Sequence, residues 1–159
     1  MRTFFLIMIA TTLAYGAYTR DATSKTVYDD QTDLTWEDDK NHLRAWDGAI
    51  DYCESLNVGG VRNWRLPNVN ELLSIVDYNT QNTVINPTFN YLTNQPYWSA
   101  TTDARDSDAA WYVNFSDGYS RSFPKSVNRY VRCVRQGKLS SSGGNTNTSV
   151  LPAIFYLLR

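Results

Sequence analysis

One predicted hairpin, residues 110–124, gathers the side chains best suited to binding chemistry. Its sequence, AWYVNFSDGYSRSFP, alternates on both arms around Asp117-Gly118, a pair typical of a two-residue type I′ turn. Such a turn fixes which residues oppose one another, and opposed residues share a face of the sheet. The predicted pairs are Ser116 with Tyr119, Asn114 with Arg121, and Tyr112 with Phe123. Rings that stack, with amide or guanidinium groups that orient a ligand, suit recognition of a sugar or a protein.

The other face of this hairpin carries Trp111, Val113 and Phe115 and is the more apolar one. We expect this second face to pack on two helices and the first face to stay open. The alternative is that the first face holds ordinary cross-strand pairs, or is covered by residues 77–96. The candidate ligand-binding residues are Tyr112, Asn114, Tyr119, Arg121, Phe123, Asp103 and Arg105.

The segment DARDSD, residues 103–108, is predicted to be a polar loop with three carboxylates. Calcium prefers such oxygen ligands, but the spacing is not that of an EF-hand and Arg105 lies among the acids. We therefore expect a solvated loop, no metal and no cofactor, with calcium as the alternative. The run WEDDK, residues 36–40, is also expected to be solvated.

Catalytic motifs are missing from the sequence. It holds no G-x-S-x-G, no H-E-x-x-H and no phosphate-cradling glycine loop. The single histidine, His42, follows a charged stretch and is expected on an exposed loop, where it is a poor acid–base catalyst. A carboxylate pair acting on a glycosidic bond stays open, because its spacing is set in three dimensions. We expect a binding protein and not an enzyme.

The chain has 159 residues and a formal net charge of -1, which gives no support to nucleic-acid binding. Residues 1–16 are typical of a signal peptide, because Arg2 precedes an apolar run and small residues follow. The run is short for a membrane span, and an uncleaved anchor is the alternative. We expect an exported protein without a transmembrane span after cleavage, located in the periplasm, on the outer surface or outside the cell.

Export leads to an oxidising compartment, where Cys53 and Cys133 can form one internal bridge. It would close a loop of about 80 residues, worth about 4.5 kcal/mol as an upper figure in the chain-entropy model. A metal or redox pair is the alternative. It is disfavoured because the chain has no C-x-x-C motif and only one histidine.

Two short strands, residues 27–30 and 34–36, are predicted before a first helix. In this helix apolar residues recur at three- and four-residue steps from Trp46 to Leu56, which places Cys53 on the buried side. Asn57 and the following glycine pair are expected to end it.

The stretch GGVRNWRLPNVNELLSIV, residues 59–76, combines a sharp corner with the start of a second helix. Pro67 makes Leu66 extended, Asn68 can cap the helix, and Glu71 can complete a capping box. Trp64 and Leu66 then share one face and anchor the corner. The predicted structural residues are Trp36, Trp46, Trp64, Leu66, Pro67, Asn68, Glu71, Trp98 and Trp111.

Residues 77–96 are predicted to be irregular, YWSATT to be a strand, and RYVRCVR to be the final strand. These boundaries predict one domain over residues 17–137. Residues 138–150 are predicted to be a Ser/Gly/Asn linker. Residues 151–159 are predicted to be a short apolar tail that docks on an envelope partner, on the domain or on a membrane surface.

Six motifs in order, LTWEDD, AIDYCESLNVGG, NWRLPNVNELLSIVDY, YWSATT, AWYVNFSDG and YVRCVR, resemble the Lcl C-terminal domain family of bacterial extracytoplasmic domains. The resemblance implies an α+β, C-type-lectin-like fold: two helices packed on a small twisted antiparallel sheet, a long loop excursion, and a disulfide from the first helix to the last strand. It also implies ligand binding, because the founding member is adhesin-like and binds sulfated polysaccharide. Asn63 stands where members often carry Asp, and the calcium-dependent sugar motifs of C-type lectins are absent.

The resulting hypothesis is an exported, adhesion-type domain that recognises a glycan or a protein on a cell surface. One alternative is a structural or assembly domain of a cell-envelope complex. The other is an enzyme that acts on envelope polymers.

Overall fold

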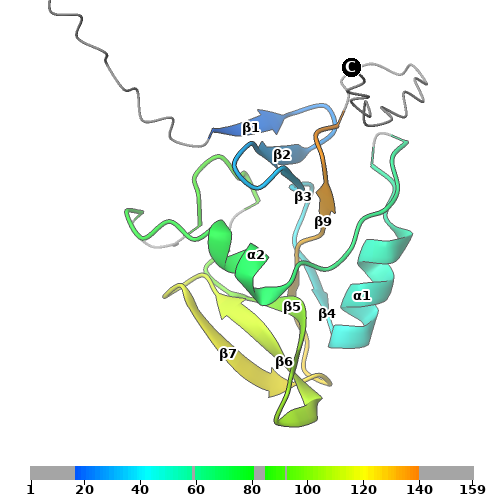
Figure 1. Cartoon of the computed structure of the whole chain (residues 1–159), viewed down its shortest axis with the longest axis vertical. Coiled ribbons are helices and arrows are strands. Elements are labelled where there is room, and N and C mark those ends of the chain that lie inside the picture. The colour runs from blue at the N-terminus through cyan, green and yellow to red at the C-terminus, as the bar shows by residue number, and fades with distance from the viewer. Residues whose placement is uncertain (1–16, 59, 81–84, 92, 140–159) are drawn as a thin grey trace, which may run out of the picture.

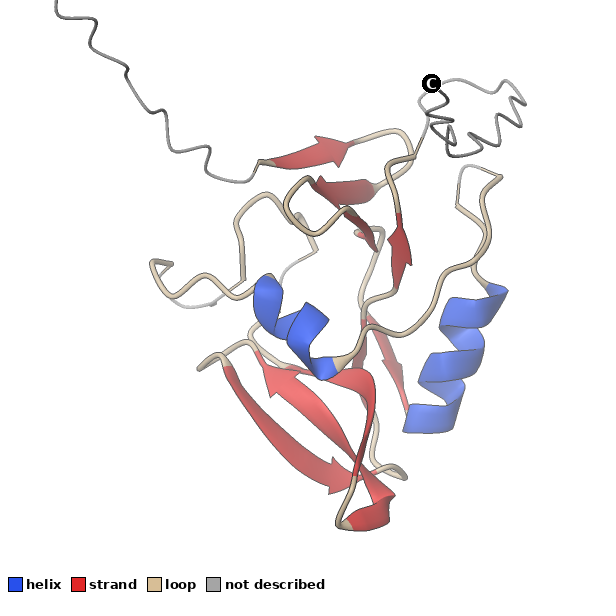
Figure 2. Ribbon diagram, viewed as in Figure 1, coloured by secondary structure: helices blue, strands red, loops and turns tan. Residues whose placement is uncertain are grey.

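The computed structural model describes residues 17–58, 60–80, 85–91 and 93–139. Within them the chain is an α+β protein with two helices and two sheets (Figures 1 and 2). The helices are α1 (Trp46–Ser55) and α2 (Val69–Ser74). The strands are β1 (Tyr18–Asp21), β2 (Thr26–Asp29), β3 (Leu34–Glu37), β4 (His42–Arg44), β5 (Pro96–Asp103), β6 (Asp106–Asn114), β7 (Tyr119–Pro124), β8 (Arg129–Val131) and β9 (Val134–Gln136). The expected signal peptide and apolar tail lie outside the described residues.

Two sheets stand where the sequence predicts one antiparallel sheet. The smaller has the strand order β1-β2-β3-β9 and the larger β4-β8-β5-β6-β7. RYVRCVR is not one strand: β8 joins the larger sheet and β9 the smaller, so Arg132 and Cys133 form the crossover between them. The pair β5–β8 is parallel, which makes the larger sheet mixed. Alternating residues alone did not reveal this break, because both halves are buried strands.

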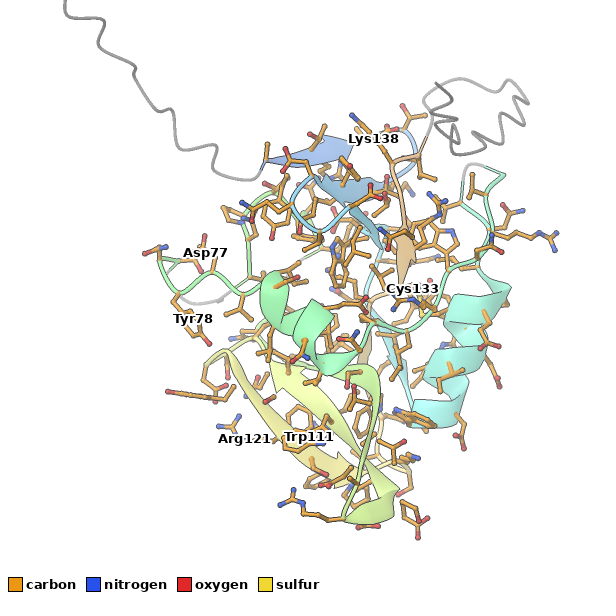
Figure 3. The ribbon with its side chains drawn as sticks, in the orientation of Figure 1. Asp77, Tyr78, Trp111, Arg121, Cys133 and Lys138 are labelled. Carbon is orange, nitrogen blue, oxygen red and sulfur yellow. A yellow bond between two sulfur atoms is a disulfide. The ribbon has the colours of Figure 1, made fainter. Side chains whose placement is uncertain are left out.

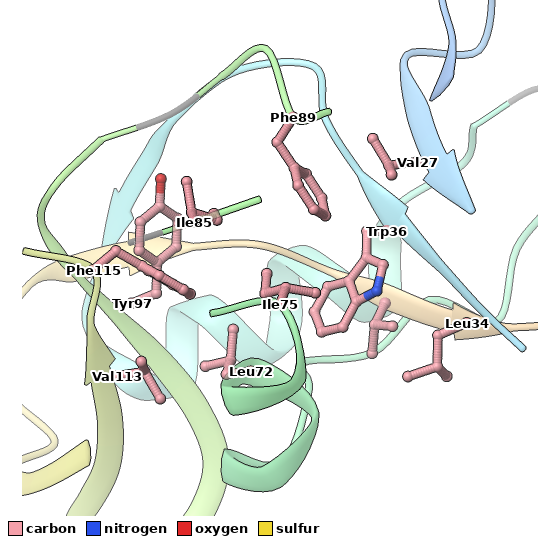
Figure 4. Close-up of a cluster of buried hydrophobic side chains, with 11 residues drawn as sticks. Val27, Leu34, Trp36, Leu72, Ile75, Ile85, Phe89, Tyr97, Val113 and Phe115 are labelled. Atoms are coloured by element: carbon pink, nitrogen blue, oxygen red, sulfur yellow. The ribbon is translucent and has the colours of Figure 1, made fainter. Parts of the chain in front are cut away.

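The first hydrophobic core lies between the two sheets, with α2 packed against it (Figure 4). Val27, Trp36 and Val134 are register partners on β2, β3 and β9 and all point into this core. Val113 of β6 and Leu72 of α2 meet them from the larger sheet's side. Ile85 and Phe89 also enter this core, so the irregular segment after α2 is anchored at two places.

The second core lies between the larger sheet and α1. Ala49 and Cys53 of α1 face Trp98 of β5 there, and Trp64 and Leu66 fill the space beside them. The predicted anchoring role of Trp64 and Leu66 is therefore confirmed. Trp36 and Trp98 are fully buried as predicted, whereas Trp46 and Trp111 are only half-buried.

The corner before α2 has the predicted capping box. Glu71 N–H donates to Asn68 Oδ1 (2.9 Å), and Asn68 N–H donates to Glu71 Oε2 (2.8 Å). The Arg65 guanidinium donates two hydrogen bonds to the Glu71 carboxylate, at 2.6 and 2.7 Å. Glu71 is therefore the ion-pair partner of Arg65. Asn63 has φ 70°, a left-handed conformation that Asn and Asp tolerate better than most residues. The positive φ alone accounts for an Asn or Asp at position 63, so no ion pair of an Asp side chain is needed to explain the preference.

Helix α1 ends earlier than predicted. Its last helical residue is Ser55, and Leu56 is already extended, with its N–H donating to Cys53 O (3.1 Å). Asn57 and Gly60 therefore lie beyond the helix, and Gly59 is outside the described residues. At the other end Ala45 provides no side-chain cap, so α1 depends on burial of its apolar side.

Glu37 and Asp38 are buried, which makes the prediction of a solvated WEDDK run wrong. Asp38 accepts hydrogen bonds from Arg20 Nε (2.9 Å) and Arg132 Nη1 (3.1 Å). It also accepts the backbone N–H groups of Asn90 (2.9 Å) and Tyr91 (3.1 Å). A buried carboxylate is stable only with such partners, and the sequence does not show that they come from three distant segments.

Arg132 completes this junction. It donates to Glu37 O (2.7 Å) and to Tyr91 O, and its guanidinium lies 4.7 Å from the centroid of the Phe89 ring. Asp38 and Arg132 therefore tie β3, the crossover and the segment 85–91 together between the sheets.

The predicted disulfide is confirmed. Cys53 on α1 bonds to Cys133 at the crossover, with the Cα atoms 5.4 Å apart and a sequence separation of 80. It links the helix of the second core to the residue that follows Arg132.

Replacing Cys53 and Cys133 together by serine should lower the free energy of unfolding by about 2–5 kcal/mol, because the unfolded chain is then no longer closed into a loop. Urea unfolding followed by tryptophan fluorescence measures this change. Wild-type protein unfolded in a reductant should match the double variant. Equal stability of oxidised and reduced protein would contradict the expectation.

Asp38→Asn should lower the free energy of unfolding by about 3–5 kcal/mol, because it leaves the charge of Arg132 buried without its partner. Asp39→Asn is the matched control, since Asp39 pairs with Lys25 at the surface. Its effect should be at most about 1 kcal/mol. Chemical denaturation of both variants tests the contrast, and similar losses for the two would refute the importance of burial.

Candidate ligand-binding site

The hairpin that carries the candidate residues consists of β6 and β7, but its register differs from the prediction. Asn114 pairs with Tyr119 and Tyr112 with Arg121, a shift of two residues. The loop therefore has four residues, 115–118, and only Gly118 has positive φ (75°), so the predicted type I′ turn is wrong. The cause is Phe115, which enters the first core instead of pairing with β7.

A shift of two keeps each side chain on its predicted face, but the two faces are covered differently. Helix α2 packs on the second face, beside Val113 and Phe115, as expected. Helix α1 packs on the first face instead, where Trp98 and Tyr112 meet in a T-shaped contact. The prediction that both helices share one face is wrong. Tyr112 is only 9% exposed and so is largely unavailable to a ligand.

The rest of the first face remains accessible. We call the side chains of Asn114, Tyr119, Arg121 and Phe123 the hairpin surface. Tyr119 is 63% and Phe123 44% exposed, and Arg121 is also exposed. Arg121 donates to both oxygens of Asp117, at 2.9 and 3.3 Å, and its guanidinium holds the pKa of that carboxyl below its ordinary value. Both groups therefore stay charged at neutral pH and fix the position of the guanidinium.

Arg129 of β8 lies beneath this surface. Its guanidinium is 3.7 Å from the centroid of the Tyr112 ring and 4.7 Å from that of Phe123. The residue is 8% exposed, and its Nε has no hydrogen-bond acceptor within the described residues. Burial lowers the pKa of Arg129, although the guanidinium remains charged at neutral pH. Arg129 thus packs Tyr112 and Phe123 into place as a stacked cation.

Tyr78 also borders this site, although no pattern in the sequence pointed to it. Its Oη donates to Gly118 O (3.1 Å), and its ring lies directly on Gly118. Figure 3 shows Tyr78 and Arg121 on the same side of the molecule, with Asp77 beside Tyr78. No periodic pattern surrounds Tyr78, since it follows α2 in an irregular segment. The glycine in the hairpin loop was the only sequence signal that something packs there.

Asp103 and Arg105, the two other candidate residues, lie at the opposite end of the hairpin. The DARDSD segment is not a loop: β5 runs to Asp103, β6 begins at Asp106, and only two residues turn between them. Arg105 binds Asp103 at 2.9 and 3.0 Å, which holds the pKa of that carboxyl well below its usual range. The two side chains satisfy each other and stand apart from the hairpin surface.

His42 lies on β4 and is mostly buried, so the expected exposed loop is wrong. Its ring stacks on Tyr52 with the centroids 4.2 Å apart, and Nε2 is 3.8 Å from Glu37 Oε1, beyond hydrogen-bond distance. Burial lowers the pKa of His42, and Arg44 and Lys40 lower it further, so the imidazole is neutral at pH 7. Tyr52 donates its hydroxyl to Glu37 (2.6 Å) instead.

Two further features bear on function. In the described ranges no three His, Cys, Asp or Glu side chains come together in a way that would hold a metal ion. No helix in the same ranges is long and apolar enough to cross a membrane.

Together, the disulfide-linked α+β frame and the accessible hairpin define a small domain with a preformed surface. The chain belongs to the Lcl C-terminal domain family, whose model matches residues 25–135. This confirms the resemblance seen in the sequence motifs. No curated protein matches the chain.

Gly118→Ala should disturb this site more than an ordinary glycine substitution. An added Cβ would approach Tyr78 Cε1 to 2.6 Å, and φ is 75°. Gly137→Ala is the matched control, because φ is 79° but nothing lies within 4 Å. Both should lose about 1 kcal/mol of stability from backbone strain. Only Gly118→Ala should also displace Tyr78, which NMR of the ring protons detects; unchanged Tyr78 signals would disprove the contact.

Proposed function

We propose that this chain is an exported ligand-binding domain of the adhesion type, which recognises a glycan or a protein on a cell surface through the hairpin surface. The observation that carries the proposal is the exposure of Tyr119, Arg121 and Phe123 together on one hairpin face. Aromatic rings and arginine are the side chains that most often dominate binding energy. An exposed cluster of this composition therefore favours recognition.

The state of these side chains supports binding further. Arg121 is held by Asp117, and Phe123 is held by Arg129. Groups that are already ordered lose little conformational entropy when a ligand binds. The surface thus resembles a rigid recognition site more than a set of mobile surface residues.

We infer binding and not catalysis from the ionisable groups. His42 is neutral and stacked, and the carboxylates of Asp103 and Asp117 are each bound to an arginine. A catalytic pair of carboxylates needs one acid free to donate its proton. Neither of these two carboxylates is free for that role.

We also assign the domain to the C-type-lectin-like class and propose that it is exported. Support for the fold comes from the two helices, the two sheets and the disulfide from α1 to the crossover between β8 and β9. The formed disulfide supports an oxidising compartment. These assignments fit a domain that meets its ligand outside the cytoplasm.

The proposal is tested by screening the full chain on a glycan array and on intact cells, followed by variants of the hairpin surface. Arg121→Ala and Phe123→Ala should each weaken binding to the ligand found by about tenfold, since each removes an anchoring group. Arg62→Ala, an exposed arginine in the loop before Trp64, is the matched control and should leave binding unchanged. Binding that ignores both hairpin variants would remove this surface from consideration.

A further inference from the structure

Tyr78 and Tyr119 are the two most exposed large aromatic side chains in the described part of the chain, at 66% and 63%. Tyr78 packs on Gly118, and Tyr119 is the next residue along the chain, so both exposed rings border the same hairpin loop. Neither ring takes part in a hydrophobic core. Exposed aromatic residues that gather at one place mark an interaction site more often than scattered ones do.

Both residues are fixed before any ligand arrives. The Tyr78 hydroxyl donates to Gly118 O (3.1 Å), so the ring keeps one position although most of it faces solvent. The Tyr119 N–H donates to Asp117 Oδ1 (3.0 Å), and the Arg121 guanidinium lies 5.7 Å from the centroid of the Tyr119 ring. Fixed rings bind with a small entropic cost.

The charges around the two rings do not favour an anionic ligand. Arg121 is neutralised by Asp117, and Asp77 adds a second carboxylate beside Tyr78. The remaining guanidinium under the hairpin, Arg129, is 8% exposed. A polyanion is attracted by an exposed excess of positive charge, which this part of the described surface lacks.

Uncharged hydrogen-bonding groups border the rings instead. Asn79 follows Tyr78, and Asn114 is the register partner of Tyr119. Ser116 adds an exposed residue with a hydroxyl in the same loop. Amide and hydroxyl groups both donate and accept, which suits a ligand rich in hydroxyls.

We propose that Tyr78 and Tyr119 form a stacking platform for the pyranose rings of an uncharged polysaccharide. A pyranose presents a C–H face that packs on an aromatic ring, while its hydroxyls reach the neighbouring amides. This inference rests on the proposed function and narrows it to one ligand class. It also moves the main contact from the strands to the loop end of the hairpin.

Affinity electrophoresis of the full chain tests the platform. The gels contain dextran, mannan, starch or xyloglucan as uncharged polysaccharides, or dextran sulfate as the anionic one. At least one uncharged polysaccharide should retard the chain equally at about 50 and about 500 mM NaCl, because no ion pair with the ligand is involved. Tyr78→Ala and Tyr119→Ala should each weaken that interaction about tenfold.

Two further variants separate stacking from folding. Tyr119→Phe keeps the ring and should bind within about twofold of wild type. Tyr91→Ala removes another exposed tyrosine, which lies in the segment bound to Asp38, and should leave retardation unchanged. Thermal unfolding of each variant shows whether the fold is intact. If Tyr78→Ala does not fold, Tyr119→Ala and Tyr119→Phe still decide the question.

Retardation by an uncharged polysaccharide that survives both alanine substitutions would overturn the platform. Retardation by dextran sulfate alone, fading with salt, would overturn it as well and leave the proposed function standing. A third outcome is that none of the five polymers retards the chain, but the array yields a ligand whose binding requires Arg121. In that case the platform proposal fails and the proposed function stands. If the array and cell screens are also negative, both proposals fail.

Discussion

The ion pair between Asp38 and Arg132 is the constraint on which the rest of this fold depends. Each group is buried, and each would be costly there without the other. Arg132 occupies the point where the chain leaves the larger sheet for the smaller, so its charge must be met between the two sheets. Asp38 meets it directly after β3, and its remaining oxygen capacity holds the backbone of Asn90 and Tyr91. One pair thus sets the spacing of the sheets and the course of the segment that closes the first core.

The disulfide lies beside this ion pair, and together they hold one part of the molecule, which we call the frame. The hairpin of β6 and β7 extends from this frame. Cys133 follows Arg132, so the covalent and the ionic links meet at the same crossover. The frame consists of the smaller sheet, the two helices and strands β4, β8 and β5 of the larger sheet. Strands β6 and β7 continue the larger sheet away from the crossover and end in the loop that contacts Tyr78. The candidate site is therefore carried by the part of the sheet that contributes least to the junction.

Sequence patterns within a few residues predicted the local features of the fold. They did not predict the contacts between segments that are far apart in the sequence. The capping box at Asn68, the buried stripe of α1 and the paired cysteines follow from spacing within a few residues or from redox chemistry. The burial of Asp38 does not, because its four donors come from Arg20, Arg132 and the segment 85–91. The hairpin shows both outcomes: its faces were predicted by alternation, but its register was not. Whether Phe115 pairs with β7 or fills a core depends on the space that the other sheet leaves for it. Tyr78 was missed for the same reason, since only the folded chain brings it to Gly118.

The position of the disulfide also determines how the domain carries mechanical load. If the two ends of residues 17–139 are pulled apart, the covalent path runs along the chain to Cys53, across the sulfur bridge to Cys133, and out through β9. Residues 54–132 form a closed branch outside that path, and both tyrosines and the hairpin surface lie on this branch. Tension between these two ends would thus strain the smaller sheet first, while the hairpin surface keeps its shape.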